Sequence, residues 1–382
     1  MATVWKNALT AFALMAASII VAGCAVPSAV LSVLSGSPYT AGAGPWGVAP
    51  DPKGRFLYVT NNSSATVSAY AVDSSSGALT ALSGSPFAVG NGPAGAVEDP
   101  TGSFLYVANC WDGTVSAYTI DPNTGALTAI AGSPYATPAA PAGLTVDPTG
   151  HFLYVADHAV ASGGNLYAFT ITAGTGALTA IAGSPFTAGT APQSVVTDPT
   201  GKFLYVANNG SGNVSGYTIN SSTGALTAMT NSPFIVGVTP QSLVFDPTGA
   251  YLYITNANAN SVSAYSVDPS SGALTALGSS PFGTGKGPWG VSLDSTGKYL
   301  LVANSGSNTV SVFSITSGTG ALAAVSGSPF AAGSSPLGIA GDPVGAFVYV
   351  ANLNDNTVSA YRLSSGSGAL KEIGLSPAPG SR

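Results

Sequence analysis

The chain has 382 residues, of which 45% are hydrophobic and only 6% are charged, and its formal net charge is −6. Nucleic-acid binding needs clustered Lys and Arg side chains, and the nine present here form no cluster, so composition excludes a nucleic-acid partner. The high hydrophobic fraction also excludes a disordered chain and predicts a packed core.

Residues 1–24 have the pattern of a targeting segment. Lys6 precedes the apolar run 8–22, which is too short for a comfortable membrane span and ends in small residues. Its end, Val21-Ala22-Gly23-Cys24, resembles the lipobox of bacterial lipoproteins, which implies cleavage before Cys24 and acylation of its thiol. We therefore expect a signal peptide over 1–24, a short tether over 25–29, and a lipid-anchored protein of the bacterial cell envelope, in the periplasm or at the outer membrane. An ordinary secretory signal is the alternative.

Residues 30–378 form a repeat array. An Asp that opens an Asp-Pro-Thr-Gly-like turn recurs about every 48 residues, at positions 51, 99, 147, 198, 246, 294 and 342. Within 189–234, four segments are strand-sized, namely 193–197, the wholly apolar 203–207, 213–219 and 225–229, and Ser-Pro-Phe then leads to the next unit. This period predicts an all-β fold, a single seven-bladed β-propeller of four-stranded antiparallel blades, with a tail over 379–382.

One segment of the repeat occurs eight times. Leu-x-x-aliphatic followed by Gly-Ser-Pro-aromatic begins at Leu31, before the first turn, and a weaker copy ends the array at 370–373. We expect a terminal strand over 30–34 to lie beside that C-terminal segment in the seventh blade and to close the ring.

The repeat resembles that of a known family. Tyr58-Val59-Thr60-Asn61 is similar to the YVTN-type repeat, and the sequence of 198–208, D-P-T-G-K-F-L-Y-V-A-N, resembles the lactonase family. The resemblance implies a seven-bladed propeller, and some members hydrolyse sugar lactones such as 6-phosphogluconolactone. Active members are expected to carry Arg-His after the Gly-x-x-Pro and a Glu after the second strand. Here no Arg-His follows that Pro, and Asn or Asp157 follows the second strands.

Residues that break the repeat are the candidates for chemistry. The loop after the second strand and the loop leading into the first share one propeller face, so off-pattern residues there can converge. We take Asp157, His158, Asp112 and Glu98 as candidate catalytic residues, with His158 as a general base oriented by a carboxylate. The alternatives are a solvated His158 in a lengthened loop and a solvated Glu98 at a strand end.

A second set of off-pattern residues predicts a ligand-binding rim. Trp side chains can stack on sugar rings or apolar ligand faces, or they can simply plug the mouth of the channel. The predicted rim consists of Trp46, Trp111, Gln193, Gln241, Lys286 and Trp289.

The sequence indicates no metal site and no cofactor site. Two His and one thiol left after lipidation, Cys110, provide no metal-ligand cluster, and no cofactor motif is present. We therefore predict a monomeric binding or interaction scaffold whose partner is a small molecule, glycan or protein, with membrane contact through the lipid anchor only. Lactone hydrolysis of the 6-phosphogluconolactonase type is the alternative function.

Overall fold

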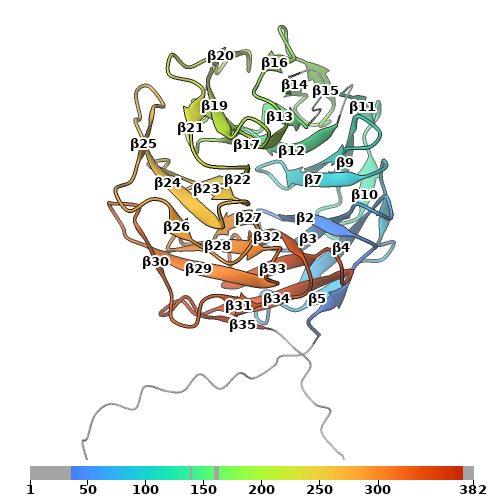
Figure 1. The fold of residues 1–382 in the computed structure, drawn as a ribbon. Helices are drawn as coiled ribbons and strands as arrows, with labels where there is room; N and C mark the ends of the chain where they lie inside the picture. The colour runs from blue at the N-terminus through green and yellow to red at the C-terminus, as the bar shows by residue number, and fades with distance from the viewer. Residues whose placement is uncertain (1–35, 138–139, 159–162, 373–382) are drawn as a thin grey trace, which may run out of the picture. The chain divides into compact units, whose positions relative to one another are not determined.

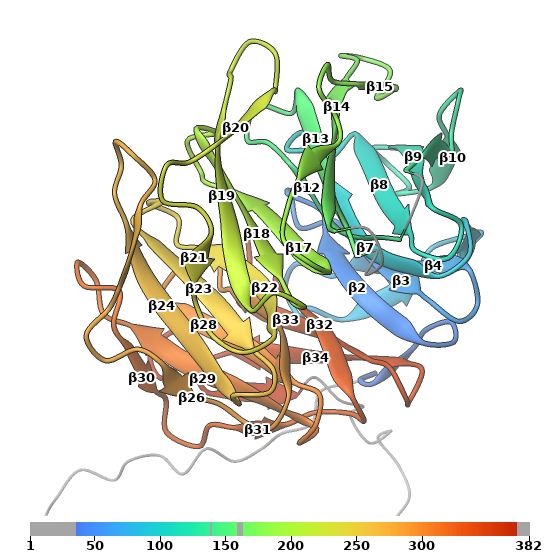
Figure 2. The same cartoon turned by 45° about the horizontal axis from the view of Figure 1, so that its top comes forward.

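The structure, a computed structural model, describes residues 36–137, 140–158 and 163–372, and these form seven antiparallel sheets arranged as blades of a ring (Figures 1 and 2). The predicted seven-bladed propeller is thereby confirmed. Cys24 and the predicted strand over 30–34 lie outside the described residues. Within the described ranges, no helical segment has the length and hydropathy that a membrane crossing requires.

Blades 1 to 7 each begin with a strand at the channel and continue outward. The first strands are β2 (Pro45–Pro50), β7 (Pro93–Glu98), β12 (Pro141–Val146), β17 (Pro192–Thr197), β22 (Pro240–Phe245), β27 (Pro288–Leu293) and β32 (Pro336–Gly341). The second strands are β3 (Phe56–Asn61), β8 (Phe104–Asn109), β13 (Phe152–Asp157), β18 (Phe203–Asn208), β23 (Tyr251–Asn256), β28 (Tyr299–Asn304) and β33 (Phe347–Asn352). The third strands are β4 (Thr66–Val72), β9 (Thr114–Ile120), β14 (Asn165–Ile171), β19 (Asn213–Ile219), β24 (Ser261–Val267), β29 (Thr309–Ile315) and β34 (Thr357–Leu363).

The outer edge of each blade is divided into two short strands that pair with different halves of the third strand. The longer pieces are β5 (Leu79–Ala81), β10 (Leu127–Ala129), β15 (Leu178–Ala180), β20 (Leu226–Ala228), β25 (Leu274–Ala276), β30 (Leu322–Ala324) and β35 (Leu370–Glu372). The shorter pieces are β1 (Tyr39–Thr40), β6 (Phe87–Ala88), β11 (Tyr135–Ala136), β16 (Phe186–Thr187), β21 (Phe234–Ile235), β26 (Phe282–Gly283) and β31 (Phe330–Ala331). The Ser-Pro-aromatic segment therefore belongs to the blade edge as well as to the link between blades.

The core lies between blades. Every residue of β18 is buried, as expected for an apolar strand covered on both sides. Tyr154 of blade 3, for example, packs in one cluster with Leu204 and Val206 of blade 4. Tyr205 crosses the next interface and donates its hydroxyl to the Gly272 carbonyl of blade 5 at 2.6 Å. Each blade is thus stabilised mainly by its neighbours.

The ring closes through blade 7, which is built from both ends of the described chain. Strand β1 pairs with β34 at the same place where β6 pairs with β4 in blade 1. Ser37 Oγ accepts the Ala360 N–H at 3.0 Å, just as Ser85 Oγ accepts the Ala69 N–H at 2.9 Å. Strand β35 supplies the other half of that edge. Closure by an N-terminal segment therefore involves residues 37–40.

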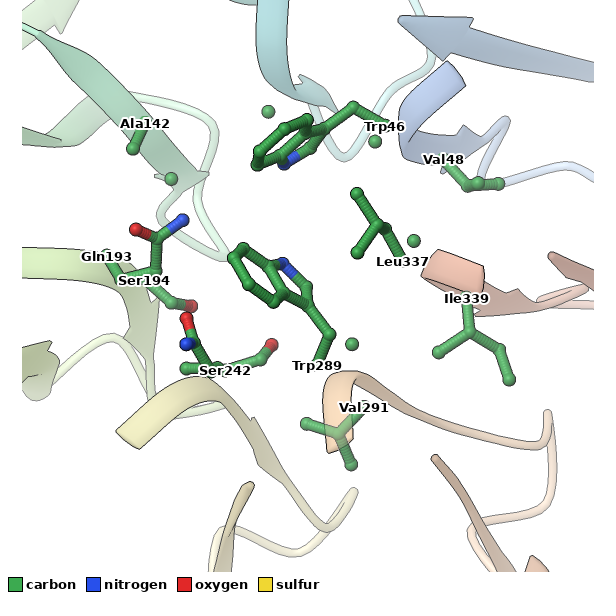
Figure 3. A pocket seen from close by; sticks show the side chains of 16 residues that line it. Trp46, Val48, Ala142, Gln193, Ser194, Ser242, Trp289, Val291, Leu337 and Ile339 are labelled. Carbon is green, nitrogen blue, oxygen red and sulfur yellow. The ribbon is translucent and has the colours of Figure 1, made fainter. Parts of the chain in front are cut away.

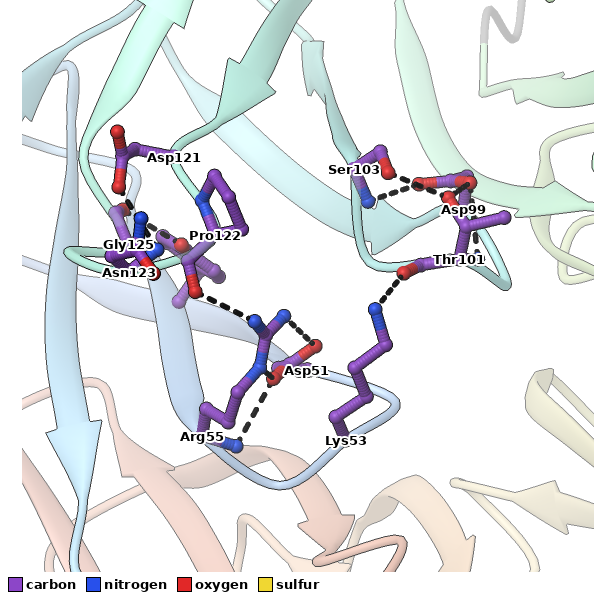
Figure 4. A network of polar contacts seen from close by, with 11 residues as sticks. Asp51, Lys53, Arg55, Asp99, Thr101, Ser103, Asp121, Pro122, Asn123 and Gly125 are labelled. Carbon is purple, nitrogen blue, oxygen red and sulfur yellow. Dashed lines mark hydrogen bonds and ion pairs between the residues drawn. The ribbon is translucent and has the colours of Figure 1, made fainter.

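The two ends of the strands define two faces of the propeller. The turn face carries the Asp turns that join first to second strands, such as 198–201. The loop face carries the loops from second to third strands and those leading into first strands. On the turn face, Arg55 contacts the Asp51 carboxylate at 2.6 Å and donates to the Pro122 carbonyl of blade 2 at 2.8 Å (Figure 4). The charged side chain of Arg55 therefore links its own turn to the neighbouring blade.

Candidate functional site

A pocket of about 360 Å³ opens on the loop face around the channel mouth. Two positions of the repeat supply most of its lining: the residue after the Pro that begins a first strand, and the residue after the Asn or Asp that ends a second strand. We call it the mouth pocket, lined by Trp46, Asn62, Ala94, Cys110, Trp111, Ala142, His158, Gln193, Asn209, Gln241 and Trp289.

Trp46 and Trp289 meet at the mouth of the channel. Their ring centroids are 5.6 Å apart and the planes lie at 87°, an edge-to-face arrangement (Figure 3). Each directly follows the Pro that begins the first strand of its blade, blade 1 or blade 6. In both strands the register against the second strand shifts after that Pro. Both indoles line the mouth pocket and the channel that continues from it. This channel, of about 160 Å³, is also lined by Val48, Leu337 and other residues of the first strands.

Trp111 forms the wall of the pocket at blade 2, and its side chain is 66% exposed. Its loop is held by Asp112, whose carboxylate accepts the Asn91 backbone N–H at 2.6 Å and the Asn91 side-chain amide at 2.9 Å. These bonds hold the pKa of Asp112 below its usual range. Gly92 lies directly beneath the indole, because a Cβ there would come within 2.5 Å of the Trp111 ring. Asp112 thus orders the Trp111 loop and is not part of the pocket lining.

His158 is the one imidazole in the mouth pocket lining as the structure describes it. Its backbone N–H donates to the Ala140 carbonyl at 2.9 Å, and its Nδ1 has no partner among the described residues. Burial lowers the pKa of His158, while Asp157 and a hydrogen bond to the Pro192 backbone act in the opposite direction. The ring is therefore neutral at pH 7. Burial raises the pKa of the Cys110 thiol, which stays protonated.

The other predicted catalytic residues lie elsewhere. Asp157 ends β13, is fully buried, and accepts the Ala140 N–H at 2.7 Å through Oδ1. It takes the structural position that Asn holds in the other blades. Glu98 ends β7 on the turn face, one strand length, roughly 16 Å, from Pro93 at the loop face. The structure does not bring Glu98 or Asp112 into the mouth pocket with His158.

The predicted rim is largely assembled. Five of its six members line the mouth pocket, namely Trp46, Trp111, Gln193, Gln241 and Trp289. Lys286 is exposed on the same face and is not among the lining residues. Gln241 is only 7% exposed, and its Oε1 has no partner within the described residues.

Comparison with known proteins agrees with this architecture. A family model for the lactonase seven-bladed β-propeller matches residues 48–239, 234–287 and 280–381. The chain belongs to the lactonase family. None of the curated proteins matches its sequence.

Solved structures show the same fold as this lactonase-family protein. A periplasmic gluconolactonase from Pseudomonas aeruginosa is similar with a TM-score of 0.70 and 21% identity, over 89% of this chain and 97% of that one. A Bacteroides fragilis protein assigned as a 6-phosphogluconolactonase has a TM-score of 0.66 and 23% identity, over 76% and 85% of the two chains. Kuenenia stuttgartiensis hydrazine synthase has the same fold, with a TM-score of 0.63 and 20% identity over 89% of this chain and 99% of that one. At these identities the likeness establishes fold alone.

The lactonase-family pocket has the chemistry of a neutral binding site. No Asp, Glu, Lys or Arg side chain belongs to the lining that the structure describes. Four carboxamides and three indoles offer hydrogen bonds and stacking surfaces. Nor does any group of three His, Cys, Asp or Glu in the described ranges stand close enough to hold a metal ion.

Sequence reasoning overlooked some members of the pocket. Asn62, Cys110 and Asn209 were not selected, although each directly follows the Asn that ends a second strand, as His158 follows Asp157. Reading that single position through all the copies would have found them. Ala94 and Ala142 were not selected because they are small and unremarkable at the position that Trp46 and Trp289 occupy.

Proposed function

We propose that this lactonase-family propeller binds a sugar or a sugar lactone in the mouth pocket. One observation carries the proposal: three indoles and four side-chain amides converge on one cavity of about 360 Å³. Aromatic faces suit the C–H faces of a saturated sugar ring, while amides can donate to and accept from hydroxyl groups. The cavity is large enough for a single sugar ring.

Tryptophan fluorescence tests this proposal directly. The chain has four Trp, of which Trp46, Trp111 and Trp289 line the pocket and Trp5 lies in the predicted signal peptide. In a full-length Trp5→Phe protein, all indole emission therefore comes from the pocket. Titration with gluconolactone and glucose is expected to change this emission to saturation. Absence of a saturable change with either sugar would contradict the proposal.

Hydrolysis of the bound lactone is the second candidate function. It is favoured by His158, a neutral imidazole in the pocket lining whose buried Nδ1 has no partner among the described residues. Such a group can take a proton from water as the water oxygen attacks the lactone carbonyl carbon. The ring C–O bond then breaks, and the proton passes to the departing oxygen, giving the open hydroxy acid.

A matched pair of variants separates binding from turnover. His158→Asn keeps a neutral polar group in the pocket, and Asp112→Asn changes a carboxylate outside it. If the protein is a hydrolase, acid release from gluconolactone measured at constant pH falls at least a hundredfold in His158→Asn and stays within a few-fold in Asp112→Asn. Fluorescence titration should still show sugar binding in both. A rate equal to the uncatalysed one in the unaltered protein would exclude hydrolysis and leave binding.

We also propose that the protein acts outside the cytoplasm, anchored through acylated Cys24. The support is the Lys6, apolar run and lipobox-like pattern of residues 1–24. Labelled palmitate should enter the protein expressed in a bacterium and should not enter Cys24→Ala. Equal labelling of both would contradict the anchor.

A further inference from the structure

The loop face is poor in positive charge around the mouth pocket. Among described residues on this face, Lys286 is the one cation, and it is exposed and does not line the pocket. Asp112, Asp157 and Asp355 stand on the same face, in the loops or strand ends that surround the channel. A phosphorylated sugar brings about two negative charges, which proteins normally hold with Arg or Lys. The described lining of this pocket offers no such side chain, and the carboxylates on the same face, although outside the lining, would repel a phosphate group.

Gln241 offers a hydrogen-bond acceptor that can favour a ligand with hydroxyl groups. Its side chain is more than nine-tenths buried, lines the mouth pocket and the channel, and leaves Oε1 without a hydrogen-bond partner among the described residues. A buried acceptor without a donor is unfavourable, so a ligand hydroxyl that donates to it gains more than it would from a solvated amide. Gln193, the equivalent residue of the preceding blade, is only half-buried.

We propose that the mouth pocket selects neutral, unphosphorylated sugars over their phosphate esters, and that Gln241 is the specificity-determining residue that accepts a ligand hydroxyl. This inference rests on the proposed sugar binding. It names the class of ligand: a polyhydroxylated ring without a phosphoryl group, recognised by indole stacking and by amides.

The first experiment compares each sugar with its own 6-phosphate. Glucose and glucose 6-phosphate, and freshly dissolved gluconolactone and its 6-phosphate, are titrated into the full-length Trp5→Phe protein at low salt. We expect the phosphorylated form to bind at least tenfold more weakly in each pair. Equal or tighter binding of the phosphorylated form would overturn this inference and leave the proposed function intact. Failure of all four to bind would overturn the proposed function, and this inference with it.

The second experiment assigns the specificity to Gln241. Gln241→Met is expected to weaken glucose binding about tenfold while raising the melting temperature, because it removes a buried acceptor that has no partner among the described residues. Gln193→Met is the matched control, the same change at the same repeat position in the neighbouring blade, and should weaken binding about threefold or less. Equal affinity losses in the two variants, or no loss in Gln241→Met, would overturn the role of Gln241.

A charge introduced at the same positions should reverse the preference. Gln241→Lys places a cation in the pocket, and we expect glucose 6-phosphate then to bind at least as tightly as glucose. Gln193→Lys tests the same point at a half-buried position that tolerates a longer side chain, in case Gln241→Lys does not fold. If a folded lysine variant rejects the phosphate ester as strongly as the unaltered protein, lack of positive charge is not the cause of selection.

Discussion

The two faces of the propeller are made from the same seven copies and differ in what the copies share. On the turn face the Asp recurs in every copy, and each carboxylate that accepts backbone N–H groups closes its own turn. Asp198 accepts the N–H groups of Lys202 at 2.8 Å and Phe203 at 2.6 Å. On the loop face the copies diverge, so that the position after the first Pro is Trp46 in one blade and Gln241 in another.

This difference follows from geometry. A turn-face Asp contacts residues of its own blade, so every copy needs it and gains the same stability from it. A loop-face residue at the channel contacts residues of other blades, as Trp46 of blade 1 contacts Trp289 of blade 6. Repetition there would give seven identical side chains competing for one space. The framework therefore requires the same residue in every copy of the repeat, whereas the site requires different residues at equivalent positions.

The largest loss of stability is expected from breaking the turn face. Asp198→Ala removes the acceptor for three backbone N–H groups, of Thr200, Lys202 and Phe203. Because the Phe203 N–H is left buried and the other two N–H groups are left partly buried, the free energy of unfolding should fall by about 3 kcal/mol in urea denaturation. Asp112→Ala is the control on the loop face, where the carboxylate is exposed, and should cost clearly less. Equal losses would mean that the two faces do not differ in this way.

A second effect on the turn face depends on pH. Burial, with smaller contributions from Asp51 and Asp99, raises the pKa of Glu98 from 4.5 to about 9 in the folded protein. The folded state therefore holds this proton more tightly than the unfolded chain, and stability is lost as pH rises from 4.5 towards 9. Glu98→Gln removes this dependence, so the stability advantage of the variant over the unaltered protein should be about 4 kcal/mol larger at pH 8 than at pH 5.

The control for the pH effect is Asp112→Asn. Hydrogen bonds from Asn91 keep the pKa of Asp112 below its usual range. The ionised Asp112 carboxylate therefore stabilises the fold at pH values above that range, and this stabilisation is lost only in acid. Its substitution should leave the slope of stability between pH 5 and pH 8 unchanged. A Glu98→Gln protein with the same slope as the unaltered protein would mean that Glu98 is ionised in the fold.

The blade interfaces should show an intermediate effect. Tyr205→Phe removes a buried hydroxyl that donates to the Gly272 carbonyl and leaves that carbonyl unpaired, which should cost about 1.5 kcal/mol in urea unfolding. Tyr135→Phe is the matched change at a partly exposed ring whose hydroxyl reaches the Ala131 carbonyl at 3.1 Å, and it should change stability by about 0.5 kcal/mol or less. Similar losses in both would mean that the inter-blade bond adds nothing beyond ring packing.

The same contrast separates what the sequence could predict from what it could not. The wholly apolar segment 203–207 has to be covered on both sides, and seven copies of it at a fixed period leave little choice but a ring of stacked sheets. The repeat also placed Trp46 and Trp289 on one face. Their edge-to-face contact at 5.6 Å depends on the diameter of the ring, which no local pattern encodes.

Individual side chains of the candidate site were harder to predict for a related reason. Asp112 follows the second strand, as His158 does, yet its oxygens are used by Asn91, 21 residues earlier in the chain. Glu98 differs from the residues at its position in the other copies, and that difference alone does not say which face it serves. Glu98 lies one strand length from Pro93, and this separation places Glu98 on the turn face.

The smallest effect on stability is expected at the pocket, where the effect on binding is the largest. Trp111 is 66% exposed, so Trp111→Ala should change the free energy of unfolding by about 0.5 kcal/mol or less. The same change removes one stacking wall, and glucose binding, followed by calorimetry, should weaken about tenfold. Val344→Ala, at a 61% exposed side chain on the turn face, should affect neither quantity. A large loss of stability in Trp111→Ala with unchanged binding would assign this indole to the framework, and the division between the two faces would no longer hold.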